Sequence, residues 1–124
     1  MSTPFDDARY ISLETFKKDG NGVKTPVWTA PLDGKLVVFT DGTSYKVKRI
    51  RNNPKCRVAE CNASGAKILG EWKDGTARIL EDKAAEERAH AALRKKYGFL
   101  MALTDFGSKL FGRIGRRAFL EISF

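Results

Sequence analysis

The fold is decided by residues 10–40, which read YISLETFKKDGNGVKTPVWTAPLDGKLVVFT. Apolar and polar side chains alternate in Tyr10–Lys17 and again in Val23–Ala30, as is typical of half-buried strands. The turn signal Asp19-Gly20-Asn21-Gly22 separates the two runs and predicts a hairpin. Because proline donates no hydrogen bond to a ladder, Pro26 predicts an edge, a bulge or a break in the second strand.

Downstream of this hairpin the chain continues with short strands and turn residues, and it adds helices. Turn signals every ~8–12 residues favour a barrel or a sandwich over parallel βαβ units. The further strands predicted are Lys35–Thr40, Lys55–Asn62, Ile68–Lys73, Thr76–Leu80 (joined to the preceding strand across Asp74-Gly75) and Arg116–Phe124. The helices predicted are a short one that Thr43 or Ser44 caps and Asn53-Pro54 ends, a long one over Asp82–Tyr97, and an apolar one over Leu100–Ile114. We therefore expect a small barrel with one or two helices packed on it.

The length of 124 residues suits a single domain over residues 1–124. No run approaches the ~20 apolar residues of a membrane span. Residues 1–7 lack the basic start and the apolar run of a secretory signal, so we expect a cytoplasmic protein. The 23 basic and 15 acidic residues leave a net charge of +8, which suits an anionic ligand.

Few residues of this chain could carry acid–base, nucleophilic or metal chemistry. Cys56 and Cys61 lie on opposite faces of a predicted strand, so they cannot pair with each other and are expected to be small buried side chains. His90, the single histidine, is expected to be a surface or packing residue. The sequence has no triad motif, zinc-ligand spacing or glycine-rich phosphate loop, so we expect no metal site and can name no catalytic side chain. If the protein is an enzyme, a cofactor does the difficult chemistry.

The most informative segment is the basic run Lys46–Lys55, which holds five cations and no carboxylate. A basic helix start that faces a barrel mouth would suit a phosphate, through both its cations and the positive end of its dipole. The hydroxyl residues just before it could add donors to the same anion: Thr40, Thr43 and Ser44. The alternative is a solvated basic face without a ligand.

A second candidate is the segment Thr25-Pro26-Val27-Trp28-Thr29. A bare backbone edge beside Pro26, with an aromatic side chain and two hydroxyl residues, could lie against a flat ring system. The alternative is an ordinary strand in which Val27 and Trp28 face two hydrophobic layers.

Seven segments carry a resemblance that spans residues 10–124: 10–16 (YISLETF), 25–28 (TPVW), 36–40 (LVVFT), 44–54 (SYKVKRIRNNP), 74–80 (DGTARIL), 93–98 (LRKKYG) and 119–122 (FLEI). In order and spacing they resemble the pyridoxamine-5′-phosphate-oxidase-like split-barrel proteins, in the branch of small flavin- or deazaflavin-dependent oxidoreductases.

This resemblance implies a mainly β fold, an antiparallel Greek-key split barrel of the FMN-binding type with about six strands and flanking helices. It also implies a homodimer with two cofactor sites at the subunit interface. The hydroxyl residue that ends the third strand and the lysine of the basic helix would hold the cofactor phosphate. The cofactor-binding residues expected on this basis are Pro26, Val27, Trp28, Thr29, Phe39, Thr40, Ser44, Tyr45, Lys46 and Lys48.

The function expected is that of an oxidoreductase in which bound FMN, or alternatively a deazaflavin coenzyme, exchanges hydride with a small organic substrate. One alternative is a non-catalytic flavin- or haem-binding carrier of the same fold. Another is a basic binder of single-stranded nucleic acid. A surplus of large apolar residues near the C-terminus also favours a subunit contact: Phe99, Leu100, Met101, Leu103, Phe106, Leu110 and Phe111.

Overall fold

The computed structural model describes residues 3–41, 45–97 and 117–124. Within these ranges the chain forms seven strands and two helices: β1 (Ile11–Phe16), β2 (Gly22–Val27), β3 (Thr29–Leu32), β4 (Lys35–Asp41), α1 (Tyr45–Asn52), β5 (Lys55–Glu60), β6 (Lys73–Ile79), α2 (Lys83–Tyr97) and β7 (Arg117–Ser123). The helix predicted over Leu100–Ile114 lies outside the described residues.

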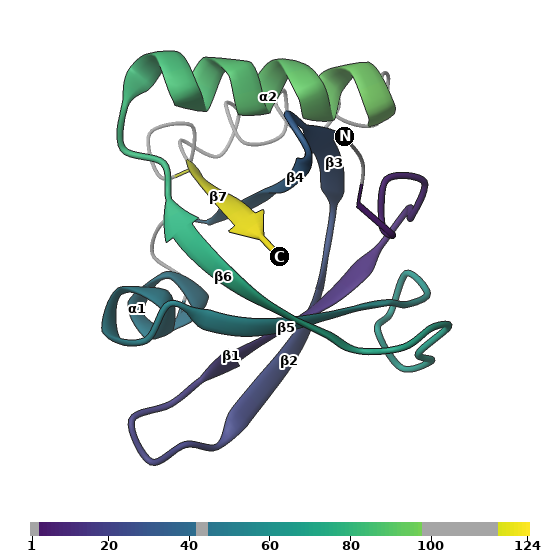
Figure 1. The fold of residues 1–124 in the computed structure, drawn as a ribbon, viewed down its shortest axis with the longest axis vertical. Coiled ribbons are helices and arrows are strands. Elements are labelled where there is room, and N and C mark those ends of the chain that lie inside the picture. The colour runs from purple at the N-terminus through teal and green to yellow at the C-terminus, as the bar shows by residue number, and fades with distance from the viewer. Residues whose placement is uncertain (1–2, 42–44, 98–116) are drawn as a thin grey trace.

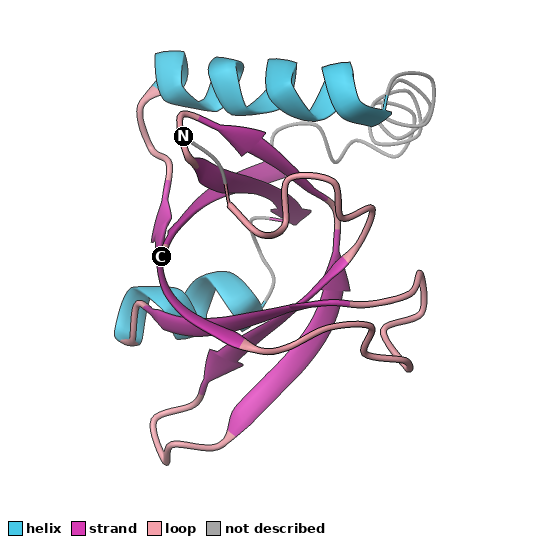
Figure 2. Ribbon diagram, turned by 45° about the vertical axis from the view of Figure 1, so that its right-hand side comes forward, coloured by secondary structure: helices cyan, strands magenta, loops and turns pink. Residues whose placement is uncertain are grey.

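All seven strands belong to one antiparallel sheet in the order β2-β1-β5-β6-β7-β4-β3. The sheet curls into a half-barrel, with α2 across one end and α1 at the side, packed against β6 and β1 (Figure 1). Figure 2 shows the same curl from another direction, with the two helices well separated. The mainly β split-barrel fold predicted from the sequence is therefore confirmed.

The two edge strands of the sheet, β2 and β3, follow each other in the chain with only Trp28 between them. β2 pairs with β1 and β3 pairs with β4, so the chain changes its strand partner at this residue. The strand predicted over Val23–Ala30 is thus two strands joined at a corner, which gives the sheet one strand more than expected. Pro26 lies in β2, where an edge strand tolerates its missing donor.

The hairpin predicted across Asp74-Gly75 is wrong. β6 runs through this dipeptide and pairs with β5 and β7. Gly75 serves close packing instead of a turn, because a Cβ there would lie 3.0 Å from the carbonyl oxygen of Ser123 in β7. The residues before β6 form a loop in place of most of the predicted strand Ile68–Lys73.

Buried apolar side chains form two clusters, and β4 contributes to both of them. Leu36 and Val38 belong to the barrel core, inside the curled sheet, together with Ile11, Leu13, Val58, Leu120 and Ile122. Val37 belongs to the helix core, between the sheet and α2, together with Ala30, Leu80, Ala89, Leu93 and Phe119. This arrangement explains why the β4 sequence is apolar on both faces.

The residues with reactive side chains pack as predicted. Cys56 and Cys61 are free and buried. The His90 ring lies 5.7 Å from the ring of Phe119, measured between centroids. Neither described helix is long and apolar enough to cross a membrane.

Candidate functional site

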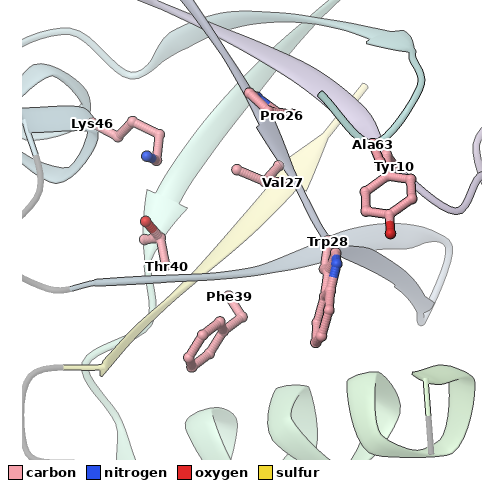
Figure 3. Close-up of a pocket in the computed structure, with 8 residues that line it drawn as sticks. All are labelled: Tyr10, Pro26, Val27, Trp28, Phe39, Thr40, Lys46 and Ala63. Carbon is pink, nitrogen blue, oxygen red and sulfur yellow. The ribbon is translucent and has the colours of Figure 1, made fainter. Parts of the chain in front are cut away.

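A cavity of about 310 Å³ opens where the barrel core meets the helix core (Figure 3). It is lined by Tyr10, Pro26, Val27, Trp28, Phe39, Thr40, Lys46 and Ala63. Val27 belongs to the barrel core, whereas Trp28 and Phe39 pack against the helix core. The structure therefore brings together six of the residues predicted to bind a cofactor, from β2, the Trp28 corner, β4 and α1.

One end of the cavity is polar. There the Lys46 ammonium and the Thr40 hydroxyl point toward the same space (Figure 3). Thr40 is 7% exposed and Lys46 is half-buried. A cation and a hydroxyl donor at one spot are the groups that bind a phosphate through charge-assisted hydrogen bonds.

The position of Lys46 follows from the way α1 is anchored. Val47 and Ile50 are buried and fix the inner face of this helix. The Arg49 guanidinium donates a hydrogen bond from Nε to Oγ1 of Thr15, at 2.6 Å, and so ties α1 to β1. The two buried side chains and this hydrogen bond fix the position of α1, and the helix in turn holds Lys46 at the cavity.

The opposite end of the cavity is aromatic. Trp28 and Tyr10 lie together there, with Ala63 behind Tyr10 (Figure 3). The register of β1 and β2, in which Ile11 pairs with Val27, explains why these two rings are neighbours. Phe39 adds a third ring to the apolar wall. Such a wall suits a flat, largely apolar ring system.

The indole of Trp28 is supported from behind by Tyr97, the last residue of α2. The two rings are stacked, with centroids 4.7 Å apart and planes 14° from parallel. Burial raises the pKa of the Tyr97 phenol above its usual value. The tyrosine is therefore neutral at physiological pH and its hydroxyl both donates and accepts hydrogen bonds.

Some predicted residues lie elsewhere. Thr29 is fully buried and its hydroxyl donates to the carbonyl oxygen of Val37, at 3.2 Å. Tyr45 and Lys48 do not line the cavity. Tyr45 is 74% exposed, and the Lys48 ammonium lies 5.7 Å from the centre of the Tyr45 ring. Ser44 is outside the described residues.

Sequence reasoning missed three residues of the site, namely Tyr10, Ala63 and Tyr97. The predicted turn alone does not find Tyr10, because a hairpin centred on Asp19–Gly22 would place it opposite Pro31, whereas the observed register, with Phe16 opposite Gly22, places it opposite Trp28. Ala63 and Tyr97 come from a loop and a helix whose packing leaves no local pattern in the sequence.

The described residues that line the cavity include no carboxylate, histidine or cysteine. Across the described ranges, no group of three or more histidine, cysteine and acidic side chains could hold a metal ion. The described lining residues are consequently equipped to bind and orient a ligand, and their side-chain hydrogen-bond donors are a phenol, a hydroxyl, an ammonium and an indole N–H.

The curled antiparallel sheet with two flanking helices and a cavity at the Trp28 corner defines a split-barrel protein. The model of the pyridoxamine 5′-phosphate oxidase family matches residues 2–124, so the chain belongs to that family. The resemblance found in the sequence is confirmed.

Solved structures share the fold at low sequence identity. The conserved hypothetical protein Rv2991 from Mycobacterium tuberculosis is 21% identical, with a TM-score of 0.71 over 95% of this chain and 74% of that one. HutZ, the heme storage protein from Vibrio cholerae, is 11% identical, with a TM-score of 0.70 over 94% and 82%. A candidate pyridoxamine 5′-phosphate oxidase from Listeria innocua is 15% identical, with a TM-score of 0.63 over 93% and 82%. No curated protein matches the sequence.

Proposed function

We propose that the protein is an FMN-dependent oxidoreductase, in which the bound cofactor exchanges hydride with a small organic substrate. The observation that carries this proposal is the pairing, in one cavity, of a polar end at Lys46 and Thr40 with an aromatic wall at Trp28. Membership of the pyridoxamine 5′-phosphate oxidase family supports it.

The residues of the cavity fit the parts of FMN. Lys46 and Thr40 would bind the phosphate, because they supply a positive charge and a hydroxyl at the same end. Pro26, Val27 and Trp28 would line one side of the ring and keep water from it. FMN would supply the redox chemistry when bound, and the described lining residues would bind and orient it.

The fate of the other cations favours a ligand with one compact anionic group. Arg49 is engaged with Thr15, and Arg51 forms an ion pair with Glu81 at 3.0 Å. Lys48 stays on the exposed side of α1. Among the described residues that line the cavity, Lys46 carries the positive charge. This pattern supports FMN, with its single phosphate, over a deazaflavin coenzyme with a long anionic tail, although the net charge of +8 taken alone slightly favours the longer anionic ligand.

The test is a titration of purified protein with FMN, riboflavin and a deazaflavin coenzyme, followed by the quenching of cofactor fluorescence. FMN should bind in the micromolar range or below, and more tightly than the other two. Turnover is then measured by reducing the FMN-loaded protein photochemically and following its reoxidation with candidate acceptors. Failure of FMN to bind below high micromolar concentrations would remove the proposal.

A haem carrier is the second candidate, because a heme storage protein shares the fold. Haem iron takes an axial ligand from His, Cys, Met or Tyr. Of the described residues that line the cavity, Tyr10 alone belongs to these types. Titration with hemin decides between the two: a sharp Soret band that Tyr10→Phe abolishes would favour the carrier, and unspecific association would dismiss it.

We also propose a homodimer with the two sites at the subunit interface. Tyr45, an exposed ring beside Lys46 in the sequence, and the apolar residues of segment 99–111 support this arrangement. Sedimentation at micromolar concentration should give about twice the monomer mass, and a clean monomer would remove the shared site.

A further inference from the structure

Tyr97 lies at the end of α2 and behind the cavity wall, and its hydroxyl meets three backbone groups at one point. It accepts a hydrogen bond from the amide of Thr29, at 2.9 Å. It also lies within hydrogen-bond distance of two carbonyl oxygens, that of Arg9 at 2.6 Å and that of Thr29 at 2.9 Å. One phenolic proton can serve one of these carbonyls at a time.

The residues that Tyr97 holds flank the two aromatic residues at the end of the cavity. Arg9 precedes Tyr10, and Thr29 follows Trp28. The Tyr97 ring also stacks on the Trp28 indole. One side chain of α2 therefore contacts both backbone segments that carry the aromatic end of the site.

The backbone at Trp28 needs such a support. The chain changes its strand partner there, from β1 to β4, so no continuous ladder fixes the corner. Tyr97 supplies hydrogen bonds to Thr29, the first residue of β3, directly after the residue at which the chain leaves β2. A leucine at position 97 would fill part of the helix core but leave the amide and carbonyl of the buried Thr29 without this partner, which is costly.

We propose that Tyr97 is a positioning residue, which sets the location of Trp28 and Tyr10 and so the shape of the wall that receives the flat ring of the ligand. The role in ligand binding rests on the proposed function, whereas the hold on Trp28 is a property of the protein alone. The phenol acts through the two aromatic residues and does not line the cavity.

The experiment first examines the protein without ligand. Trp72 contacts Lys24 and Arg57 and is not among the residues that line the cavity, so Trp72→Phe leaves Trp28 as the only tryptophan. In that background Tyr97→Leu should shift the Trp28 emission to longer wavelength and raise its quenching by acrylamide about twofold or more. Tyr97→Phe keeps the stacked ring and should have a smaller effect.

The matched control is Ala89→Gly, two turns earlier in α2 and also buried in the helix core. It weakens the helix through backbone entropy and lies roughly 12 Å along the helix from Tyr97. The Trp28 spectrum should stay unchanged in this variant. Equal spectra and equal quenching in Tyr97→Leu and Ala89→Gly would overturn the proposal, because Tyr97 would then act only on stability.

FMN titrations of the same variants give the second readout. Tyr97→Leu should weaken FMN binding about tenfold and Tyr97→Phe severalfold, with Ala89→Gly within about twofold of the parent. If the parent does not bind FMN, the proposed function fails while the fluorescence measurement still decides the role of Tyr97. If the parent binds and Tyr97→Leu binds equally well, the positioning role is refuted and the proposed function stands.

Discussion

Replacement of Lys46 by alanine is the most direct probe of the cavity, because this side chain supplies the positive charge at its polar end. A hydrogen bond to a charged group is worth about 1.5–3 kcal/mol. Lys46 is half-buried, so water screens part of the interaction and the lower end of that range applies, about 1.5–2 kcal/mol. At about 1.4 kcal/mol per tenfold change, Lys46→Ala should weaken FMN binding roughly 10- to 30-fold.

The assay compares two ligands that differ only in the phosphate. FMN and riboflavin are titrated against the parent and Lys46→Ala by fluorescence quenching at fixed ionic strength. The substitution should affect riboflavin by less than about twofold, because riboflavin lacks the group that Lys46 would bind. The control is Lys48→Ala, which removes a charge from the exposed side of the same helix and should leave both affinities within about twofold.

Two results would refute the reasoning. If Lys46→Ala weakened FMN and riboflavin equally, the lysine would act on the ring or on folding instead of on the phosphate. If Lys48→Ala weakened FMN as much as Lys46→Ala, the effect would come from net charge and not from the polar end of the cavity.

Three further predictions concern the protein without ligand. Burial raises the pKa of Cys56 to about 12 and also raises that of Cys61, so both thiols should resist Ellman's reagent at pH 8 and react fully only in denaturant; rapid labelling of the native protein would contradict this. The hydrogen bond from Arg78 lowers the pKa of the Glu121 carboxyl, so its contribution is present above about pH 4.5 and lost as the pH falls through the folded-state value. Glu121→Gln should therefore flatten the acid limb of the unfolding free energy, and an unchanged acid limb would contradict the assignment. Gly65 has φ +76°, and a Cβ there would lie 3.1 Å from the ring of Pro26. Gly65→Ala should therefore lower the free energy of unfolding in urea by about 1–2 kcal/mol, whereas an unchanged midpoint would show that the loop adapts.

Most of the strands could be predicted because their signals are local. Alternation in Tyr10–Lys17 and the turn at Asp19–Gly22 specify a hairpin without reference to the rest of the chain. The corner at Trp28 could not be predicted in this way, since the alternation runs through it unbroken and the change of partner depends on β4. The prediction at Gly75 failed although its signal is local. Asp74-Gly75 has the sequence of a turn, but the glycine lies within a strand and its lack of a side chain allows β7 to pack closely.

The sequence predicted the polar end of the site, but it did not predict which cation of the basic run lines the cavity. The basic helix start after Thr40 predicted that Lys46 and Thr40 lie near each other, and both line the cavity. Lys46 and Arg49 share one side of the helix, so helical geometry alone could not tell which of them lines the cavity. Arg49 instead donates a hydrogen bond to Thr15, which lies more than thirty positions earlier in the chain. The role of Tyr97 could not be predicted, because its hydroxyl bonds backbone groups, and every residue has such groups whatever its side chain.

The two edge strands have a consequence for how copies of the protein can associate. β2 contains Pro26 and the four-residue β3 contains Pro31, so each edge of the sheet formed by the described residues offers one donor fewer to an incoming strand. Growth of the sheet by strand addition from another molecule is thereby discouraged at both rims. An amyloid-like extension of the sheet is therefore disfavoured. Copies of the protein would associate through side-chain surfaces, whose shape and chemistry can limit association to a defined partner.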